Sequence, residues 1–301
     1  MHKRGVYFIA NNRVLDLSIA FLNSFRKYNP NISLCLIPYD NNYDKILTLQ
    51  KVYRFDVFEN STLLQECDEI SVKFQNSVLG SFRKLAMWDG MFEEFIYIDV
   101  DTLVLDNIDF CFQHLDKYSC ITSHSNIQNI RKFVWKDSIY SSDHLSEEQI
   151  AFAANTGFIV SKQGFFDMRW IKNNTDKALS VKEHMELSCQ EQPFLNYLIV
   201  TSEKPYTSLL VLLSTVEKNC NIKLEFWAGR KGGKIVNGKF YFNNMNSFFL
   251  LHWAGEWQPR KIDWILYGFL SFMHLIDKNH IPKFYIFMPY KKIWNYYRNL
   301  N

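Results

Sequence analysis

Two aspartates near the end of an apolar run are the side chains of this sequence that most clearly suggest chemistry. Asp99 and Asp101 interrupt a run that extends from Phe95 to Val104. In a continuous strand side chains alternate, so the two carboxylates are expected on one face, roughly 6.5 Å apart along the backbone. Carboxylates without a neighbouring cysteine or histidine suit a hard divalent cation, whose common task is to hold substrate phosphates. The spacing therefore favours a metal site for a diphosphate-containing substrate.

The segments before Asp99 predict the sheet that positions it. Apolar strands are expected at 5–10, 33–38 and 55–58, and helices at 43–52 and 81–91. A further helix is expected after the first strand, where four apolar residues share one face before 29–31 ends it: Leu15, Ile19, Leu22 and Phe25. Strands that alternate with helices imply a mostly parallel sheet covered on both faces. Ligands of such sheets bind beyond the carboxyl ends of the strands, which is where Asp99 and Asp101 fall. The sequence thus predicts an α/β fold with a ligand site at that edge.

The second half of the chain has a looser pattern. The polar stretch 123–149 predicts loops and short helices of the kind that contact substrates. Apolar strands are expected at 158–160 and 248–251, and Asn237-Gly238 predicts a tight hairpin between them. The 301 residues are 48% hydrophobic, enough to bury a large core, and no low-complexity linker divides them. We expect a single core.

Composition narrows the function classes. The net charge of +3 and the pI of about 8.4 are too mild to indicate a nucleic-acid partner. The six scattered cysteines form no CxxC pair and are expected as reduced thiols. The N-terminus lacks the pattern of a signal peptide, and the longest apolar run, 264–276, is shorter than the roughly 20 residues of a membrane span. These features predict a cytoplasmic protein.

Four further segments accompany the aspartates. They are Arg83 to Trp88, Asn155-Thr156-Gly157-Phe158, Glu191 to Asn196, and His252-Trp253-Ala254-Gly255. Together with 95–109 they closely resemble the glycogenin-like retaining glycosyltransferases of the GT-A fold, a family that includes bacterial lipopolysaccharide galactosyl- and glucosyltransferases. The resemblance implies a GT-A catalytic domain at 1–260, with a mostly parallel mixed central sheet flanked by helices, and a C-terminal aromatic and basic helical tail at 261–301.

The resemblance also implies roles for particular residues. Asp99, Asp101 and His252 would bind Mn²⁺, with Mg²⁺ as the alternative, and the ion would bridge the phosphates of a UDP-sugar. Glu191 and Gln192 would be the catalytic residues, with Glu191 near the anomeric carbon. The implied donor-binding residues are Ala10, Asn11, Lys84, Asp99, Val100, Asp101, Asn155, Gly157, Gln192, Gly255, Gln258 and Arg260.

Three departures from the family pattern leave parts of this assignment open. Gln258 stands where the family commonly has a lysine, although Arg260 and Lys261 follow closely. Glu191 replaces the usual aspartate and is one methylene longer. The family's aromatic residue after the first strand is absent from 10–14, so the identity of the base is the least secure part of the donor.

Several of these residues also have a purely structural interpretation. Lys84 could be a solvated helix charge, His252 a hydrogen-bonded core histidine, and Asn155 a turn cap. Glu191 and Gln192 could begin a helix in solvent. The tail from Pro282 to Asn301 combines lysines and aromatic residues, which suits either docking on anionic lipid at the inner face of the membrane or packing on the domain.

Three competing functions fit the sequence less well. A haloacid-dehalogenase-like phosphatase needs Thr or Val where Leu103 stands, and a later acidic pair. A sugar-nucleotide-forming nucleotidyltransferase needs a glycine-rich loop after the first strand, but 10–13 has no glycine. A non-enzymatic carbohydrate-binding protein gives no reason for Asp99, Asp101 and His252 to occur together. We therefore predict a retaining, metal-dependent hexosyltransferase that uses a UDP-hexose and acts on a cell-surface glycan, glycolipid or protein.

Overall fold

The computed structural model describes residues 2–215, 224–236, 239–242, 248–256 and 288–300. The chain divides into two compact units, each built from segments that are discontinuous in sequence. Unit 1 comprises 1–15, 31–100 and 108–224, and unit 2 comprises 16–30, 101–107 and 225–301. The predicted domain boundary at 260–261 lies outside the described residues, so the division into 1–260 and 261–301 stays a prediction.

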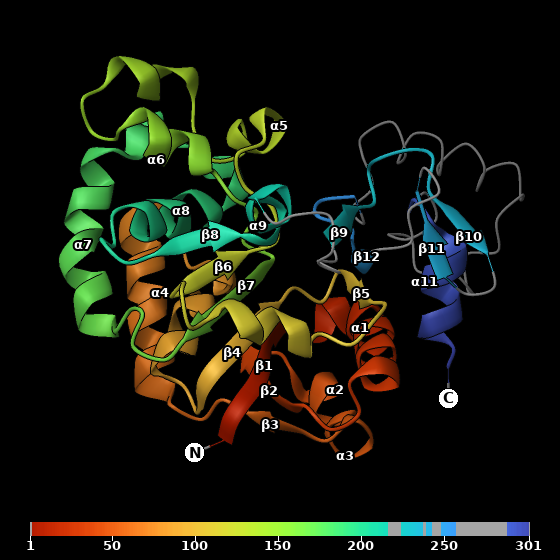
Figure 1. Ribbon diagram of the computed structural model, residues 1–301. Coiled ribbons are helices and arrows are strands. Elements are labelled where there is room, and N and C mark those ends of the chain that lie inside the picture. Colours follow the sequence, from red (N-terminus) through yellow and green to blue (C-terminus); the bar gives the residue numbers. More distant parts are fainter. Residues whose placement is uncertain (1, 216–223, 237–238, 243–247, 257–287, 301) are drawn as a thin grey trace, which may run out of the picture. The chain divides into compact units, whose positions relative to one another are not determined.

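Unit 1 is built on a seven-stranded mixed sheet (Figure 1). The strands in spatial order are β3 (Phe55–Val57), β2 (Ser33–Pro38), β1 (His2–Ala10), β4 (Phe92–Ile98), β7 (Phe158–Lys162), β6 (Cys120–Thr122) and β8 (Tyr206–Ser208). The first four are parallel, whereas β7 runs antiparallel to both of its neighbours. The predicted α/β architecture with a mostly parallel sheet is confirmed.

Alternation along the strands buries both faces of this sheet. Tyr7 and Ile9 of β1 and Tyr97 of β4 belong to a large apolar core on one face. Val6 and Phe8, which point the opposite way, are also fully buried. Strands buried on both faces read as continuous apolar runs, which is why sequence alone identified β1, β2 and β7.

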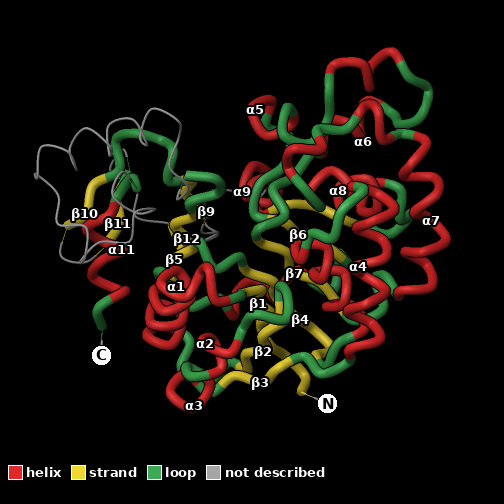
Figure 2. Tube along the Cα trace, turned by 180° about the vertical axis from the view of Figure 1, so that it is seen from behind, coloured by secondary structure: helices red, strands yellow, loops and turns green. Residues whose placement is uncertain are grey.

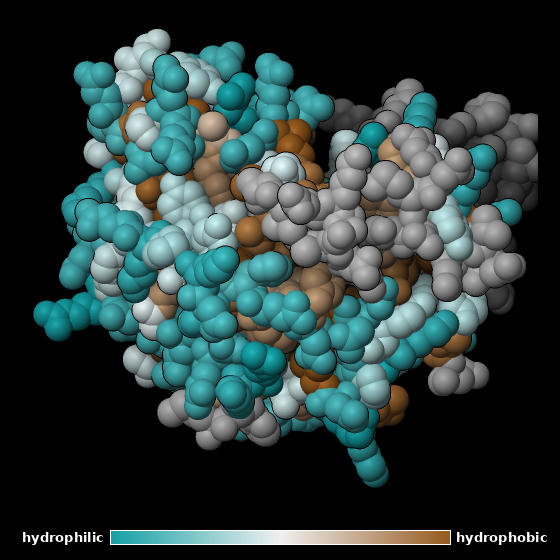
Figure 3. Space-filling view, viewed as in Figure 1, coloured by the Kyte–Doolittle hydropathy of each residue, from teal (hydrophilic) through white to brown (hydrophobic). Residues whose placement is uncertain are grey.

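Helices of unit 1 contribute further side chains to the apolar core. The α-helices are α2 (Asp44–Leu47), α3 (Gln50–Tyr53), α4 (Ser61–Gln75), α5 (Gln128–Arg131), α6 (Glu147–Phe152), α7 (Met168–Ser180), α8 (Gln192–Val200) and α9 (Leu209–Thr215). Helix α7 packs against both α4 and α8 (Figure 2). The surface of unit 1 over α6 and α7 is mainly hydrophilic (Figure 3).

Short 3-10 helices make up much of the remaining chain of unit 1. They are η1 (Asn12–Val14), η2 (Gly80–Asp89), η3 (Asp109–His114), η4 (Asp137–Ser141), η5 (Lys182–His184) and η6 (Leu187–Cys189). The helix predicted at 81–91 is therefore the 3-10 segment η2, and its residues from Gly80 to Trp88 are buried. The polar stretch 123–149 consists of loops and short helices, as predicted.

Unit 2 contains a three-stranded sheet in the order β5 (Thr102–Val104), β12 (Phe248–His252) and β9 (Leu224–Trp227). The hairpin of β10 (Lys234–Val236) and β11 (Lys239–Tyr241) confirms the predicted pairing, although its two turn residues lie outside the described part. Helix α1 (Leu15–Tyr28) falls in unit 2 from its second residue, and α11 (Lys291–Arg298) belongs to the same unit.

The apolar run 95–104 is not one strand, which corrects the geometry predicted for the two aspartates. Strand β4 ends at Ile98, residues 99–101 have no regular structure, and β5 begins at Thr102 in a different sheet. Both halves are apolar because both strands are buried, so composition could not reveal the break. The alternation rule therefore does not place Asp99 and Asp101 on one face of a strand. The helix predicted at 43–52 is likewise divided, into α2 and α3.

Two further features agree with the composition. Cys35, Cys67, Cys111, Cys120 and Cys189 are free thiols, and Cys220 lies outside the described residues. Among the helices described, none combines the length and the apolar character required to span a membrane.

Candidate functional site

The carboxyl end of β4 brings Asp99 to the turn at 155–157. Ile98, the last residue of β4, pairs with Phe158, the first residue of β7. One step further, the backbone N–H of Asp99 donates to the carbonyl oxygen of Gly157 over 2.9 Å. The sheet register therefore joins the first predicted metal ligand to the turn that is predicted to contact the donor sugar.

Asp99 belongs to a group of charged and polar side chains in unit 1 that we name the Lys84 cluster: Lys84, Tyr97, Asp99 and Glu191. The ammonium nitrogen Nζ of Lys84 lies 2.6 Å from Oε1 of Glu191 and 3.1 Å from Oδ1 of Asp99. The Tyr97 hydroxyl donates to the same oxygen of Asp99. Lys84 is only 4% exposed, so it is not a solvated surface charge. A buried ammonium needs such partners because its desolvation is costly.

The charges of this cluster fix the state of the lysine. Burial by itself lowers the pKa of Lys84, but the carboxylates of Asp99 and Glu191 outweigh it, so the pKa is raised above its usual value. Lys84 therefore stays a cation throughout the neutral range. The Asp99 side chain is 29% exposed, and it is the part of the cluster that a ligand can reach.

The predicted sugar-contacting turn is tied to the start of α8. The Asn155 side chain accepts the backbone N–H of Gly157 through Oδ1, which makes it the turn cap that its residue type allows. The backbone N–H of Thr156 donates to Oε1 of Gln192 over 3.3 Å, and the Thr156 hydroxyl donates to Glu191. Asn155 thus keeps its amide nitrogen as the group that can face a sugar hydroxyl.

Helix α8 connects this turn to the polar stretch 123–149. Its N-cap residue Glu191 is 5% exposed, so it does not begin the helix in solvent. The Gln192 amide nitrogen donates to the carbonyl oxygen of Phe133 over 3.1 Å. One turn later, the buried Asn196 exchanges two hydrogen bonds with the backbone of Ala154. These bonds hold Gln192 and the turn in a fixed relative position.

The donor-binding residues predicted after β1 lie at the same sheet edge. Tyr7 of β1 pairs with Tyr97 of the parallel strand β4, so Ala10 and Val100 each stand three residues beyond this pair. Asn11 is 4% exposed; its amide donates to Asp40 over 2.7 Å, and its oxygen caps η1. The structure thus assigns the Asn11 side chain to shaping the loop after β1.

A second charged group, which we name the His252 cluster, consists of Asp101, Glu225 and His252 in unit 2. Strands β5 and β12 pair with Thr102 opposite His252, and the N–H of Trp253 donates to the carbonyl oxygen of Asp101 over 2.8 Å. The backbone ladder therefore places Asp101 beside His252, although about 150 residues separate them in sequence. Nε2 of His252 lies 3.2 Å from Oδ1 of Asp101, and Nδ1 lies 2.6 Å from Oε1 of Glu225.

The imidazole is buried between two carboxylates. His252 is 2% exposed; burial lowers its pKa, but Asp101 and Glu225 outweigh this, and the pKa is raised well above its usual value. Nε2 is within ion-pair distance of Asp101 but has no hydrogen bond of acceptable geometry among the described residues. Two cis ligands of an octahedral ion, each about 2.1 Å from it, are about 3 Å apart. The spacing of Oδ1 and Nε2 therefore fits a shared divalent cation.

Gly255 ends the turn that follows His252. Its φ of +74° lies in the left-handed region, which glycine adopts without strain. The N–H of Glu256 donates to the carbonyl oxygen of Trp253 and closes the turn. This is the close backbone turn that the His-x-x-Gly pattern predicts. Gln258, Arg260 and Lys261 lie outside the described residues.

Three residues of the candidate site were not singled out from the sequence. Glu225 is a single acidic residue between Leu224 and Phe226, and an acid in an apolar strand was the one available signal. Tyr97 read as an ordinary core aromatic. Asn196 was part of the recognised segment, but its bonds to the sugar-contacting turn depend on tertiary contacts.

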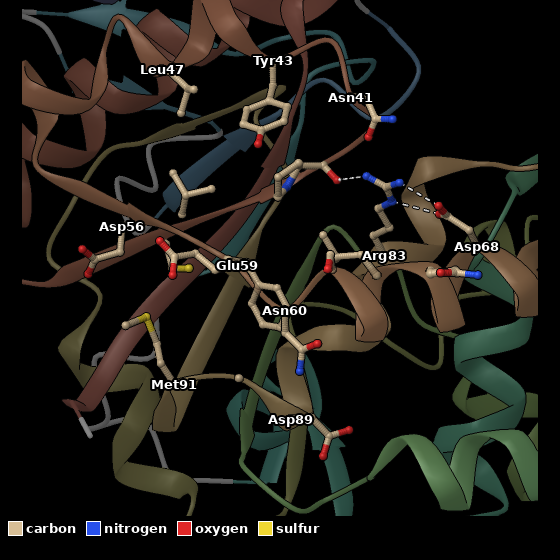
Figure 4. Close-up of a pocket in the computed structure, with 18 of the residues that line it drawn as sticks. Asn41, Tyr43, Leu47, Asp56, Glu59, Asn60, Asp68, Arg83, Asp89 and Met91 are labelled. Carbon is tan, nitrogen blue, oxygen red and sulfur yellow. Dashed lines mark hydrogen bonds and ion pairs between the residues drawn. The ribbon is translucent and has the colours of Figure 1, made fainter.

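Unit 1 also contains a cavity of about 1070 Å³ bordered by β2, β3, α4 and the end of η2 (Figure 4). Four carboxylates line it, those of Asp56, Glu59, Asp68 and Asp89. Arg83, its cationic lining residue, makes two hydrogen bonds to Asp68 and a third to the carbonyl oxygen of Pro38, as the dashed lines show. Among the described residues, no predicted site residue lines this cavity, so it does not belong to the candidate site.

Comparisons with known proteins find similarity only at the level of structure. No protein-family model matches the sequence, and no curated protein matches it. The structure is similar to the bifunctional glycosyltransferase WbbM, with a TM-score of 0.52 and 13% identity. It is also similar to the glycosyltransferase GlyE of Streptococcus pneumoniae, at 0.50 and 10%, and to the galactosyltransferase LgtC in complex with donor and acceptor sugar analogs, at 0.50 and 8%.

The matched lengths differ among these structures. The similarity to LgtC covers 92% of this chain and 97% of LgtC. For WbbM and GlyE it covers 86% and 100% of this chain but only 47% and 61% of those proteins, so the chain spans about half and three fifths of their lengths. At such low identity the likeness shows the fold, which is the GT-A type predicted from the sequence. Membership of the glycogenin-like family stays a prediction.

Proposed function

We propose that the protein is a metal-dependent glycosyltransferase that moves a hexose from a UDP-sugar to an acceptor hydroxyl, with retention of the anomeric configuration. The observation that carries this proposal is the buried Nε2 of His252, which has no hydrogen bond among the described residues and lies 3.2 Å from Asp101. This nitrogen and the neighbouring carboxylate oxygen have the spacing of two ligands of one ion. A divalent cation is the partner that this nitrogen and this oxygen fit.

We assign Asp99 as the third ligand from chain geometry. One residue separates it from Asp101, so their Cα atoms are at most about 7.6 Å apart. Two carboxylate oxygens and one imidazole nitrogen favour Mn²⁺ over Mg²⁺. When bound, the ion neutralises the charge that develops on UDP as the sugar–phosphate bond breaks.

The Lys84 cluster supplies a fixed cation next to Asp99. Lys84 stays protonated and would neutralise a phosphate or donate to the donor sugar. Its short bond to Glu191 orients that carboxylate. In the proposed reaction Glu191 lies near the anomeric carbon, where a preorganised negative charge stabilises the developing positive charge.

The remaining residues would bind and orient the donor. Asn155 and Gln192 would contact sugar hydroxyls, and the bonds that tie both to one turn support this role. The residues proposed to complete the donor site are Ala10, Asn11, Val100, Gly157, Gly255, Gln258 and Arg260.

We further propose that the acceptor is a cell-surface glycan, a glycolipid or a protein, and that the reaction takes place in the cytoplasm or at the inner face of the membrane. In α11, Trp294 and Tyr297 are buried within unit 2 and cannot meet lipid, whereas Lys292 is exposed. Tyr296 of the same helix is also exposed, so a peripheral membrane contact would use this ring and the charge of Lys292. Lys292→Glu should then weaken cosedimentation with anionic vesicles, and unchanged cosedimentation would remove this contact.

A donor panel tests the proposed function. The full chain is incubated with UDP-, GDP- and dTDP-hexoses in Mn²⁺, Mg²⁺ or EDTA, and the released sugar and its anomer are measured. We expect hydrolysis of a UDP-hexose with Mn²⁺ and little in EDTA. Asp99→Asn should lower the rate, whereas Asp176→Asn, an exposed aspartate on α7, should not.

Two outcomes would contradict the proposal. Turnover that is unchanged in EDTA or in Asp99→Asn would exclude metal-dependent transfer. Calorimetric binding of a glycan without any Mn²⁺-dependent binding of UDP would favour the carbohydrate-binding protein instead.

A further inference from the structure

Glu225 holds the side of His252 that faces away from Asp101. It lies on β9, next to β12 in the three-stranded sheet, and is 6% exposed. Its Oε1 atom is 2.6 Å from Nδ1 of His252. A buried carboxylate is costly unless it is paired, and this short bond to the imidazole provides such a pairing.

This contact decides which ring nitrogen is free to bind a cation. A neutral imidazole has one N–H and one nitrogen lone pair. A carboxylate at Nδ1 keeps the proton there, because an oxygen acceptor needs an N–H donor. The lone pair then lies on Nε2, the atom that is 3.2 Å from Asp101 and has no hydrogen bond among the described residues.

We propose that Glu225 is a positioning residue that fixes the tautomer and the orientation of His252, so that Nε2 and Asp101 bind one divalent cation together. This inference rests on the metal dependence of the proposed function and adds a residue that does not touch the ion. Glu225 acts through the imidazole of His252: it holds the orientation of the ring and makes Nε2 a stronger electron-pair donor. Loss of such a partner typically lowers metal affinity about 10- to 100-fold.

The alternative is that Glu225 only helps unit 2 to fold. Two substitutions separate the explanations. Glu225→Gln keeps an oxygen that can accept the N–H of Nδ1 but removes the charge, whereas Glu225→Ala removes the acceptor. A positioning role predicts a graded loss of Mn²⁺ affinity, about 10-fold for Gln and up to about 100-fold for Ala. A purely structural role predicts lower stability with unchanged affinity in the folded fraction.

The experiment titrates the full chain with Mn²⁺ and measures the free ion by electron paramagnetic resonance. Spin-echo modulation of the bound ion then reports whether an imidazole nitrogen is a ligand. Thermal unfolding in EDTA shows that each variant is folded. Asp101→Asn is the reference for a lost ligand, and Asp16→Asn, a carboxylate of unit 2 paired with Arg298, is the matched control.

The outcomes separate this inference from the proposed function. The expected result is the affinity order wild type, Gln, Ala, with the nitrogen signal weakened or lost in Glu225→Ala. If both Glu225 variants bind Mn²⁺ like the wild type while Asp101→Asn does not, the positioning role is wrong and the metal site stands. If the wild type itself binds no Mn²⁺, both proposals fall.

Discussion

The two charged clusters neutralise their buried carboxylates in different ways. In the Lys84 cluster a permanent cation contacts both Asp99 and Glu191, within 3.1 Å and 2.6 Å. In the His252 cluster the cation is an imidazole, whose charge depends on pH, and one of its nitrogens has no hydrogen bond among the described residues. In the first cluster the cation is part of the chain, whereas in the second Nε2 and Oδ1 have the spacing that two ligands of a divalent ion could adopt.

This difference separates two tasks within one proposed site. A lysine that is already bonded keeps its charge and its position without a ligand, so it preorganises the donor side. A histidine between two carboxylates can exchange its Nε2 proton for a metal ion. Removal of metal should therefore affect the His252 cluster much more than the Lys84 cluster.

The largest effect is expected from Asp101→Asn, which removes the anionic oxygen next to Nε2. Loss of the ion's contribution to the leaving group, several kcal/mol, should lower Mn²⁺-dependent UDP-hexose hydrolysis by about 100-fold or more. Initial rates at saturating Mn²⁺ measure this, with Asp16→Asn as the control. A rate within about threefold of the wild type would show that the His252 cluster does not hold the catalytic ion.

The second effect concerns stability in the Lys84 cluster. Lys84→Met leaves two carboxylates without their cation and should destabilise the fold by about 3 kcal/mol, because removal of one partner of a buried pair leaves an uncompensated charge. Adding Glu191→Gln should restore part of this loss. Urea unfolding of the single and double variants gives the coupling.

A matched pair at the surface provides the control for that measurement. Lys172 contacts Glu66 over 2.6 Å but is 41% exposed, so Lys172→Met should change stability by no more than about 1 kcal/mol. Equal effects of Lys84→Met and Lys172→Met would mean that burial does not make the Lys84 ion pairs more important for stability than a surface pair.

Sequence reasoning located the parts of the site that depend on local pattern. The runs that became β1, β2, β7 and β12 were recognised because buried strands are continuously apolar. The order of the motifs identified the fold type that the structure confirms. Asn155 and Gly255 were placed in turns because their residue types favour turn conformations.

The missing parts depend on tertiary contacts. The break between β4 and β5 was invisible because residues on both sides of it are equally apolar. Helix α4 was overlooked, although Asn60 caps it, because its apolar positions are diluted by polar ones. Glu225 could not be paired with His252 because they are 27 positions apart and the segment between them gives no periodic signal.

The smallest effect is a pH dependence that should appear in one cluster and not in the other. The pKa of His252 is raised in the folded state, since Asp101 and Glu225 outweigh the opposing effect of burial. The protonated ring therefore stabilises the ion-free protein fully below its unfolded pKa of about 6.5, and this stability is lost as the pH rises through the raised value. The midpoint temperature of thermal unfolding in EDTA should therefore decrease as the pH is raised from 6 to 9. The decrease should be about 2–4 °C for each kcal/mol of stability lost.

The Lys84 cluster should contribute nothing to this pH dependence of the midpoint temperature, because the pKa of Lys84 is raised from a value that is already above pH 9. In His252→Gln the midpoint should therefore vary less with pH than in the wild type. Saturating Mn²⁺ should stabilise the wild type most at the alkaline end, where no proton competes for Nε2. Parallel pH profiles for the wild type and His252→Gln would show that the imidazole does not carry the charge that distinguishes the two clusters.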